Sequence, residues 1–445
     1  MLALLAPRIA LNQRQAQLFL VLMLGIGALI TLAQWPSLGI YLTIVAALMV
    51  PIAISTGTET GVNAAVLLLI VLLGLWILGM IARPGGIRFH QNRAVYASLV
   101  LCLVALIAFG FGQFAWFPIQ SAPIGAQVGG LMIFLLTAGA FLLVAHQVQN
   151  LNQLKAMTWV FLAVSALYVA VRLLGYPESR IYQIFVRNAT QSSMFFIFLI
   201  SIGTSQALLN TELSKGWRAA IGALVAGTLF LNLIVGRYWL SGLLPALVGV
   251  VFILLLYRPR WALVLMILGG IYLLVGTNFL GDIISGGDNA FSQMTRLEAW
   301  RILAEMVSVN PIFGLGMANY YWYTPLYSIL GWNVRFNSHN NYVDIVAQAG
   351  LVGLGVYLWL LWEILLTGLR LLKGIQPGFS KAYIYGALGG LVGAAFAGML
   401  GDWVVPFVYN IGLEGFRASM IGWMFLGGII AIERMQSKDI KSGPR

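Results

Sequence analysis

Long apolar runs separated by short polar connectors follow one another along almost the whole chain. A run of about 20 apolar residues is long enough to cross the hydrocarbon layer of a membrane as a helix. The pattern predicts spans at residues 17–34, 37–54, 62–82, 94–113, 127–146, 156–174, 192–209, 219–236, 238–257, 261–280, 342–369, 382–402 and 415–432. We therefore predict an all-α polytopic membrane protein with about 12 transmembrane helices.

The basic residues predict how these spans are oriented. Connectors that carry Lys and Arg face the cytoplasm by the positive-inside rule, and they lie at 83–93, 155, 210–218, 257–260, 370–381 and in the C-terminal tail. Two full crossings within 17–54 would place Arg8 and Arg14 outside. We therefore expect one net crossing there, with 17–34 interfacial or re-entrant and both termini inside; two crossings would give about 13 spans.

The composition excludes an ordinary soluble protein. Hydrophobic residues make up 60% of the chain and charged residues only 9%, whereas a soluble domain carries about 25% charged residues. The net charge of +12 lies in short connectors without a basic stripe that includes aromatic residues, so we predict no nucleic-acid partner. The single cysteine, Cys102, excludes an internal disulfide.

The basic residues on the predicted outer side are all arginines, while the lysines all fall on the cytoplasmic side. The arginines are Arg172, Arg180, Arg187, Arg237, Arg296, Arg301, Arg335 and Arg417. A planar guanidinium binds phosphate oxygens in a bidentate manner that an ammonium group cannot match. This bias predicts a phosphorylated or diphosphate-bearing ligand on the outer face, unless lysine is simply the commoner cytoplasmic anchor.

One connector is long, from about Gly281 to Asn341, and long loops are usually functional or disordered. Apolar residues at near-helical spacing predict an amphipathic helix over 293–308. The aromatic residues that follow form either an interfacial belt or a platform for sugars or lipid headgroups. The chain thus divides into N-terminal transmembrane helices (1–280), an outer, partly helical loop before the third-last span (281–341), C-terminal transmembrane helices (342–432) and a cytoplasmic tail (433–445).

A histidine stands where the third-last span begins. Asn337 or Ser338 is expected to cap a helix that starts near His339. Gly350 follows three helical turns later on nearly the same face, and Gly353 one turn beyond, which predicts a glycine-lined groove below the histidine. A histidine of near-neutral pKa suits a general base for an alcohol.

The segment "HNNYVDIVAQAGLVG" fits the pattern H-[NSQ]-x9-G-x-x-G, with His339, Asn340, Gly350 and Gly353 in place. This pattern resembles that of the bacterial O-antigen ligase (WaaL) family, within a superfamily of O-antigen ligases and polymerases.

Two upstream segments extend the resemblance. "TRLEAWRILAEMVSVNPIFGLG" (295–316) is similar to the family's Arg…Trp…Asn/Asp-Pro…Gly-hydrophobic-Gly stretch. "LIVGRYWLSG" (233–242) resembles a turn that carries another essential arginine, although the family usually has Ser-Arg-Gly where this chain has Gly236-Arg237-Tyr238.

The resemblance implies a multi-pass protein of the bacterial inner membrane that transfers O-antigen polysaccharide from undecaprenyl diphosphate to lipid A–core oligosaccharide on the periplasmic face. It implies His339 as the catalytic residue and Arg237 and Arg296 as diphosphate-binding residues. Arg187, which opens a predicted span on the outer side, is a weaker candidate for the diphosphate, and Asp402, which ends one there, is a candidate supporting or acceptor-site residue together with Asn340, Arg301 and Arg335. The resemblance implies no cofactor.

The residues favour an inverting, metal-independent reaction. No pair of carboxylates accompanies His339, so a covalent sugar intermediate is not expected. The outer acidic residues Glu59, Asp282 and Asp288 form no Asp-x-Asp cluster, and arginines are able to stabilise the departing diphosphate in place of a metal.

Three alternatives remain open at this point. A polymerase or a protein O-oligosaccharyltransferase would use the same donor with another acceptor, and a transporter would move a lipid-linked glycan. A transporter is expected to show repeated halves and charges at mid-membrane, and neither is apparent.

Overall fold

The computed structural model describes residues 13–54, 61–84, 86–175, 182–235, 240–275 and 287–442. Nearly all of these residues are helical; a short antiparallel pair, β1 (Ala53–Ile54) and β2 (Val62–Asn63), is the one sheet among them. The all-α class predicted from the apolar runs is thereby confirmed.

Each predicted apolar run contains a helix among the described residues; the run 37–54 is helical only as far as Met49, shortly before Pro51. The first helices are α2 (Gln13–Gln34), α3 (Pro36–Met49), α4 (Ala64–Ile81), α5 (Arg93–Phe111), α6 (Ile124–Gln147), α7 (Leu151–Leu173), α8 (Arg187–Thr190) and α9 (Ser193–Leu209). The later helices are α10 (Lys215–Phe230), α11 (Leu240–Tyr257), α12 (Pro259–Val275), α14 (Gly287–Val307), α15 (Asn319–Tyr323), α16 (Asn341–Gly374), α17 (Phe379–Leu400) and α18 (Gly412–Ser442).

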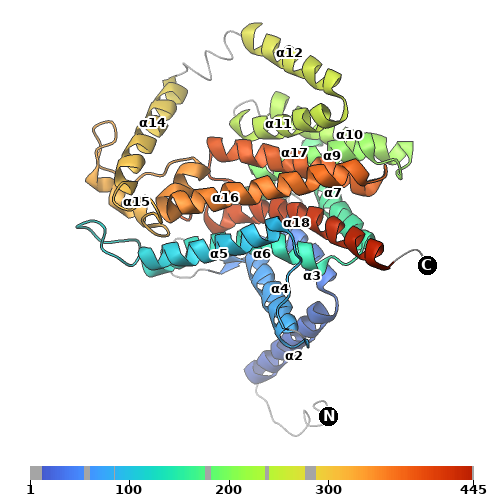
Figure 1. The fold of residues 1–445 in the computed structure, drawn as a ribbon, viewed down its shortest axis with the longest axis horizontal. Coiled ribbons are helices and arrows are strands. Elements are labelled where there is room, and N and C mark those ends of the chain that lie inside the picture. Colours follow the sequence, from blue (N-terminus) through green and yellow to red (C-terminus); the bar gives the residue numbers. More distant parts are fainter. Residues whose placement is uncertain are drawn as a thin grey trace.

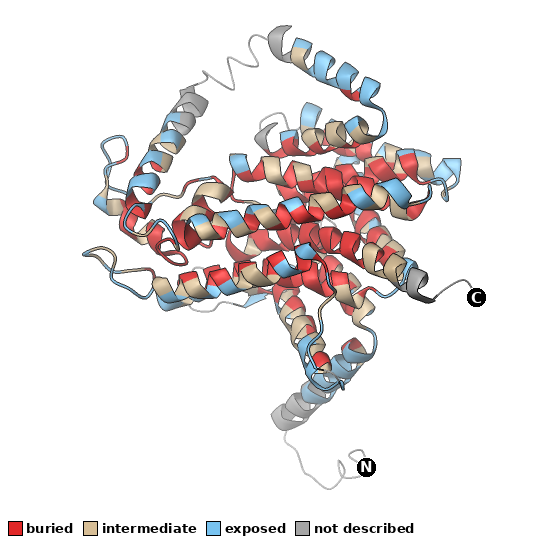
Figure 2. Cartoon of the chain, in the orientation of Figure 1, coloured by how far each residue is buried: buried red, intermediate tan, exposed pale blue. Residues whose placement is uncertain are grey.

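The C-terminal helices form the centre of the bundle. Helix α18 packs along α6, α17 against α9 and α11, and α16 against α5 (Figure 1). Figure 2 shows that buried residues concentrate on these central helices, whereas α2 and α12 at the periphery are largely exposed. In a membrane protein the exposed apolar side chains of such peripheral helices face lipid.

Eight of the described helices are long and apolar enough to cross a membrane, and three more described helices are apolar but shorter. Helices α2 and α3 meet at a bend of 115°, which is compatible with one broken span or a re-entrant segment. This bend agrees with the expectation of one net crossing within 17–54. The total of about 12 spans stays a prediction.

Helix α16 is broken near its start, and the break shapes the surrounding loops. Gly350 has φ +70° and ψ −172°, so the helical path is interrupted there. Residues of the Pro311–Gly316 loop fill the break: the backbone N–H of Leu315 donates to Ala347 O (2.9 Å), and that of Leu351 donates to Pro311 O (2.9 Å). The prediction that His339 and Gly350 share one continuous helical face is therefore wrong.

The glycines at this crossing permit backbone to touch backbone. A Cβ on Gly350 would lie 2.1 Å from Ile312 O, and one on Gly316 would lie 2.1 Å from Gly112 Cα. Gly350 and Gly316 thus serve the close crossing of two backbone segments.

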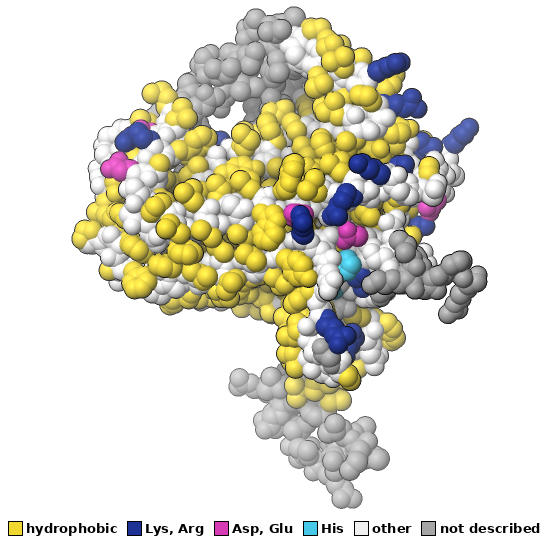
Figure 3. Space-filling view, viewed as in Figure 1, with side chains coloured by type: hydrophobic (Ala, Val, Ile, Leu, Met, Phe, Trp, Pro, Cys, Tyr) yellow, Lys and Arg dark blue, Asp and Glu magenta, His cyan; other side chains and the backbone are white. Residues whose placement is uncertain are grey.

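The long loop contains the helix that was predicted for it. Helix α14 corresponds to the expected 293–308, beginning six residues earlier and ending at Val307; it packs against α16, and its residues Ile302, Leu303 and Met306 are buried. Figure 3 shows one side of the bundle covered by hydrophobic side chains, with charged residues collected mainly toward its ends.

Candidate active site

His339 lies just before the first turn of α16, not within it. Its backbone φ is +47°, in the left-handed region that residues other than glycine seldom adopt. Asn340 is the N-cap, and its Oδ1 accepts hydrogen bonds from the backbone N–H of Tyr342 (2.9 Å) and Val343 (3.3 Å). The expectation that Asn337 or Ser338 caps this helix is therefore wrong, and the side chain of His339 is left exposed at the entrance to α16.

A buried network of hydrogen-bonded polar groups holds the backbone in this conformation. Ser338 Oγ and Tyr320 Oη both donate to Asp344 Oδ1, at 2.7 and 2.5 Å. The backbone N–H of Asn340 donates to Ser338 Oγ (3.0 Å), and Trp300 Nε1 donates to Ser338 O (2.8 Å). Strained backbone persists where its surroundings over-determine it and is common at functional sites. This hydrogen-bond network fixes the backbone that carries the side chain of His339.

The loop after α17 supplies the groups that meet the imidazole. Asn410 Nδ2 lies 3.4 Å from His339 Nδ1 and donates to Asp402 Oδ1 at 2.6 Å. Asp402 is only 1% exposed, and its second oxygen accepts the backbone N–H of Phe407 (3.0 Å). Sequence reasoning included Asp402 but missed Asn410, which belongs to no motif and stands in a loop of ordinary composition.

Arg296, on α14, is the fourth member of a polar cluster that also contains His339, Asn410 and Asp402. One guanidinium nitrogen, Nη1, donates to Leu400 O (3.1 Å), while Nε is buried without a hydrogen-bond partner among the described residues. Burial lowers the pKa of Arg296, and the nearby charge of Asp402 opposes that shift. No hydrogen bond of Nη2 is formed among the described residues, so this end of the guanidinium is left to donate to an anion.

The electrostatics favour a neutral imidazole. Part of the His339 side chain is exposed, but the protein around the rest of it desolvates the imidazole and lowers its pKa. The positive charge of Arg296 lowers this pKa further. Burial raises the pKa of Asp402 to about 6, against the hydrogen bonds from Phe407 and Asn410. Among the described residues, no three His, Cys, Asp or Glu side chains come together as metal ligands would.

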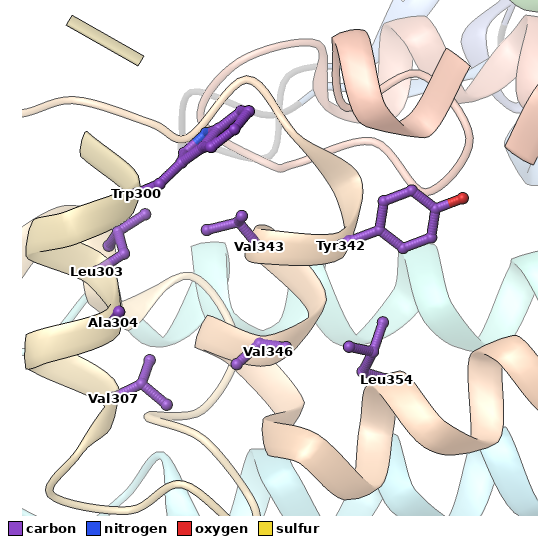
Figure 4. Close-up of a pocket in the computed structure, with 8 residues that line it drawn as sticks. All are labelled: Trp300, Leu303, Ala304, Val307, Tyr342, Val343, Val346 and Leu354. Carbon is purple, nitrogen blue, oxygen red and sulfur yellow. The ribbon is translucent and has the colours of Figure 1, made fainter. Parts of the chain in front are cut away.

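An apolar pocket of about 230 Å³ opens between α14 and α16, beside the cluster. Its walls are Trp300, Leu303, Ala304 and Val307 of α14 and Tyr342, Val343, Val346 and Leu354 of α16 (Figure 4). Trp300 lines the pocket and also bonds to the residue before His339. The pocket and the polar cluster are therefore adjacent parts of one site.

Residues 216–358 match the family model described as O-antigen ligase. The resemblance noted in the sequence is thereby confirmed. The matched segment includes Arg237, Arg296 and His339 but ends before Asp402 and Asn410. A search of curated proteins finds no match.

Within the matched segment, two of the three principal site residues are described. Arg296 and His339 belong to one cluster, because the charge of Arg296 acts on the imidazole and Trp300 of the same helix bonds to Ser338. Arg237 lies outside the described residues. It follows a five-residue π-helical turn, Leu231–Val235, and such turns are frequent at functional sites.

Two of the remaining arginines predicted for the site, Arg187 and Arg301, have other surroundings than His339 among the described contacts. Arg187 is exposed at the start of α8, which packs against α3 and α18. Arg301 pairs with Glu298 (2.8 Å) and Glu305 (3.5 Å) on the exposed face of α14. No described hydrogen bond or ion pair joins either arginine to His339, so their roles in the site stay predictions.

One of the arginines predicted for the outer side has a structural use that the sequence did not reveal. Arg417 is 1% exposed and pairs with Glu414 at 2.9 Å. Its guanidinium also donates to the backbone carbonyl of Ala46 in the last turn of α3, and to those of Val50 and Ile52 just after this helix. This arginine joins α18 to α3, and its donors are already used, so it is not available for a phosphate.

Aromatic side chains of the loop stack beside the cluster. The ring of Tyr321 stacks on Tyr409 with centroids 4.6 Å apart, and Trp322 Nε1 donates to Tyr409 Oη (2.7 Å). The guanidinium of Arg335 lies 3.8 Å above the ring of Trp322. Tyr409 immediately precedes Asn410, whose amide contacts His339, so this aromatic group lies near the imidazole.

Proposed function

We propose that this protein is an O-antigen ligase. It transfers an O-antigen polysaccharide from undecaprenyl diphosphate to lipid A–core oligosaccharide, on the periplasmic face of the bacterial inner membrane. The observation that carries the proposal is the placement of an arginine with free donors, an exposed neutral histidine and an apolar pocket side by side within a segment of O-antigen ligase type.

Each part of the site matches one part of a lipid-linked glycan donor. Arg296 presents free N–H donors to the diphosphate, together with Arg237 from the preceding helix pair. The pocket between α14 and α16 takes the first isoprene units of the lipid, because it is lined almost wholly by apolar side chains. The aromatic group around Tyr321, Trp322 and Tyr409 offers flat faces to sugar rings.

The reaction is a direct displacement. The acceptor hydroxyl attacks the anomeric carbon, its proton passes to His339, and the bond between that carbon and the phosphate oxygen breaks. The electron pair leaves with the diphosphate, whose growing negative charge is stabilised by Arg296 without a metal ion. Attack from the side opposite the leaving group inverts the anomeric centre.

The test is a reaction with purified components. The protein is mixed with undecaprenyl-diphosphate-linked O-antigen and lipid A–core, in EDTA and without nucleotide, and the products are separated by size. We expect the core to shift to high-molecular-weight lipopolysaccharide with wild type, and no shift with His339→Ala at equal folded concentration.

Other outcomes identify other activities. Longer glycan on the undecaprenyl carrier with untouched core indicates a polymerase. Loss of transfer in EDTA that Mg²⁺ restores contradicts the metal-independent step. No glycan transfer by wild type to either acceptor contradicts the whole proposal and favours a transporter.

A further inference from the structure

Asn410 stands between the imidazole and the one buried carboxyl group of the α17–α18 loop. Its Nδ2 contacts both His339 Nδ1 (3.4 Å) and Asp402 Oδ1 (2.6 Å), and no other side-chain hydrogen bond of Asn410 is formed among the described residues. The side chain of Asn410 is exposed, which leaves its amide free to turn over. One amide therefore connects the two titratable groups.

The direction of the first hydrogen bond decides the direction of the second. An ionised carboxylate only accepts hydrogen bonds, so it requires the NH₂ end of Asn410 to face Asp402. The same NH₂ group then faces His339 Nδ1, which must act as the acceptor. The ring proton of a neutral imidazole is thereby placed on Nε2, and the nitrogen that remains for the acceptor hydroxyl is a donor rather than a base.

Protonation of Asp402 reverses the chain. The carboxylic acid donates to Asn410, and the amide turns its oxygen toward both neighbours. A carbonyl oxygen has two lone pairs, so it also accepts a proton from His339 Nδ1. The lone pair of the ring is then on Nε2, which has no partner among the described residues and is able to take the proton of a hydroxyl.

We propose that Asn410 is a positioning residue that sets the ring tautomer of His339 according to whether Asp402 carries a proton. This inference rests on the proposed function and deepens it, because it names the form of the site that is able to act as a base. Asn410 itself touches neither of the reacting atoms.

The charged and titratable groups around Asp402 come from three elements. Arg296 of α14 favours the ionised carboxylate, whereas Asp344 of α16 opposes it. Tyr320 of α15 stays protonated, since burial and these carboxyl groups raise its pKa. With a pKa of about 6, Asp402 is mostly protonated below that pH and ionised above it. The competent form is therefore lost as the pH rises through about 6.

One substitution imitates the protonated state permanently. The backbone N–H of Phe407 requires an acceptor at the position of Asp402 Oδ2. In Asp402→Asn the amide oxygen takes that position, so the new NH₂ group faces Asn410 and donates to it at every pH. Asn410→Ala removes the connection and serves as the matched variant.

The first readout does not depend on transfer. Protein labelled with ¹⁵N-histidine is placed in bilayers at pH 8, and the ring signals of His339 are assigned by their absence in His339→Gln. We expect wild type to carry the proton on Nε2 and Asp402→Asn to carry it on Nδ1. The same tautomer in both proteins, or a change that persists in the Asn410→Ala, Asp402→Asn double variant, overturns the inference.

The second readout is the pH profile of glycan transfer. We expect the rate of wild type to fall above about pH 6 and that of Asp402→Asn to stay level, so that the variant is about tenfold or more faster at pH 8. Asn410→Ala is expected to lower kcat with little change in KM. An Asp402→Asn variant that folds but falls with pH as wild type does, or is inactive at every pH, overturns the inference. Absence of transfer by wild type would instead count against the proposed function.

Discussion

The two ends of helix α16 each carry a cluster of histidine, amide and acidic side chains, but they use their hydrogen bonds differently. At the start lies the His339 cluster, which comprises His339, Asn410, Asp402 and Arg296. Toward the other end lies the His90 cluster, which comprises His90, Asn92, His146 and Glu433, beside Thr367 of α16.

In the His90 cluster the polar groups bond to one another across helices. Glu433 Oε2 accepts from Asn92 Nδ2 (2.6 Å) and lies 3.3 Å from His90 Nε2. The backbone N–H of His90 donates to His146 Nε2 (3.0 Å), and His146 Nδ1 bonds Leu142 O (2.9 Å). These bonds join α18 and α6 to the start of α5, so the cluster stabilises the packing of these helices.

In the His339 cluster the groups are fixed in position, but part of their hydrogen-bonding capacity has no partner among the described residues. His339 is exposed with a free Nε2, and Arg296 makes one hydrogen bond among the described residues. The comparison teaches that residue type alone does not mark a reactive site. What marks it is hydrogen-bonding capacity that the fold positions and leaves without a partner.

Arg296 is expected to give the largest effect among the variants that sharpen this difference. Arg296→Ala should lower kcat by about 10²–10³-fold, because one preorganised donor to the developing charge is lost. Arg296→Lys should recover only part of the rate, since an ammonium group lacks the planar fork. The measurement is the rate of glycan transfer. Arg370→Ala toward the other end of α16, where the guanidinium bonds to Leu366 O and Thr367 Oγ1, is the control and should leave the rate within about twofold; equal losses in both would contradict the assignment.

Gly350→Ala tests whether the break in α16 supports the His339 cluster. The new Cβ would meet Ile312 O at 2.1 Å in a backbone of φ +70°, so we expect a loss of about 3 kcal/mol or more in unfolding free energy. Gly355→Ala is the matched variant, because a Cβ there meets nothing within 4 Å. Thermal unfolding in detergent measures both, and equal stability of the two would rule out the close crossing.

Glu433→Gln tests whether the His90 cluster stabilises the packing of α5, α6 and α18. We expect it to lower the unfolding free energy by about 1–2 kcal/mol, since a half-buried acceptor shared by two donors is weakened, while transfer per folded molecule stays unchanged. Thermal unfolding and the transfer assay are run on the same preparation. A large loss of transfer without loss of stability would place chemistry at this end.

The smallest effect is expected from Glu305→Gln, which removes one exposed partner of Arg301. Exposed ion pairs contribute about 0–1 kcal/mol, so stability and transfer should both stay close to wild type. Thermal unfolding and the same assay give the baseline against which the Glu433 and Arg296 variants are read, and a change as large as theirs would remove the basis of the comparison.

The sequence predicted the helices well because long apolar runs leave few structural choices in a membrane. It also led to His339 and Arg296 through a motif and a charge bias, and to Asp402 through its place at the end of a predicted span. It failed where tertiary contacts decide. Gly350 looks like a packing glycine until the Pro311–Gly316 loop is seen to enter the helix beside it, and Asn410 gains its meaning only from its two neighbours.

The charge bias also included a residue of another kind. Arg417 shares the predicted outer side with Arg296, yet its donors bond to Glu414 and to backbone carbonyls near the end of α3. No local pattern distinguishes an arginine that closes a helix contact from one that binds a ligand, since both require the same planar donors. Only the location of the partners separates them.

The measurement that most directly tests the central claim compares His339→Ala with His90→Ala in one transfer assay, with thermal unfolding measured alongside. We expect His339→Ala to lose about 10²–10⁴-fold in rate, the span usual for a general base, while its unfolding temperature stays near that of wild type. We expect His90→Ala to keep its rate per folded molecule and to unfold at a lower temperature. Full transfer by His339→Ala, or loss of transfer by a stably folded His90→Ala, would contradict the assignment of chemistry to the His339 cluster.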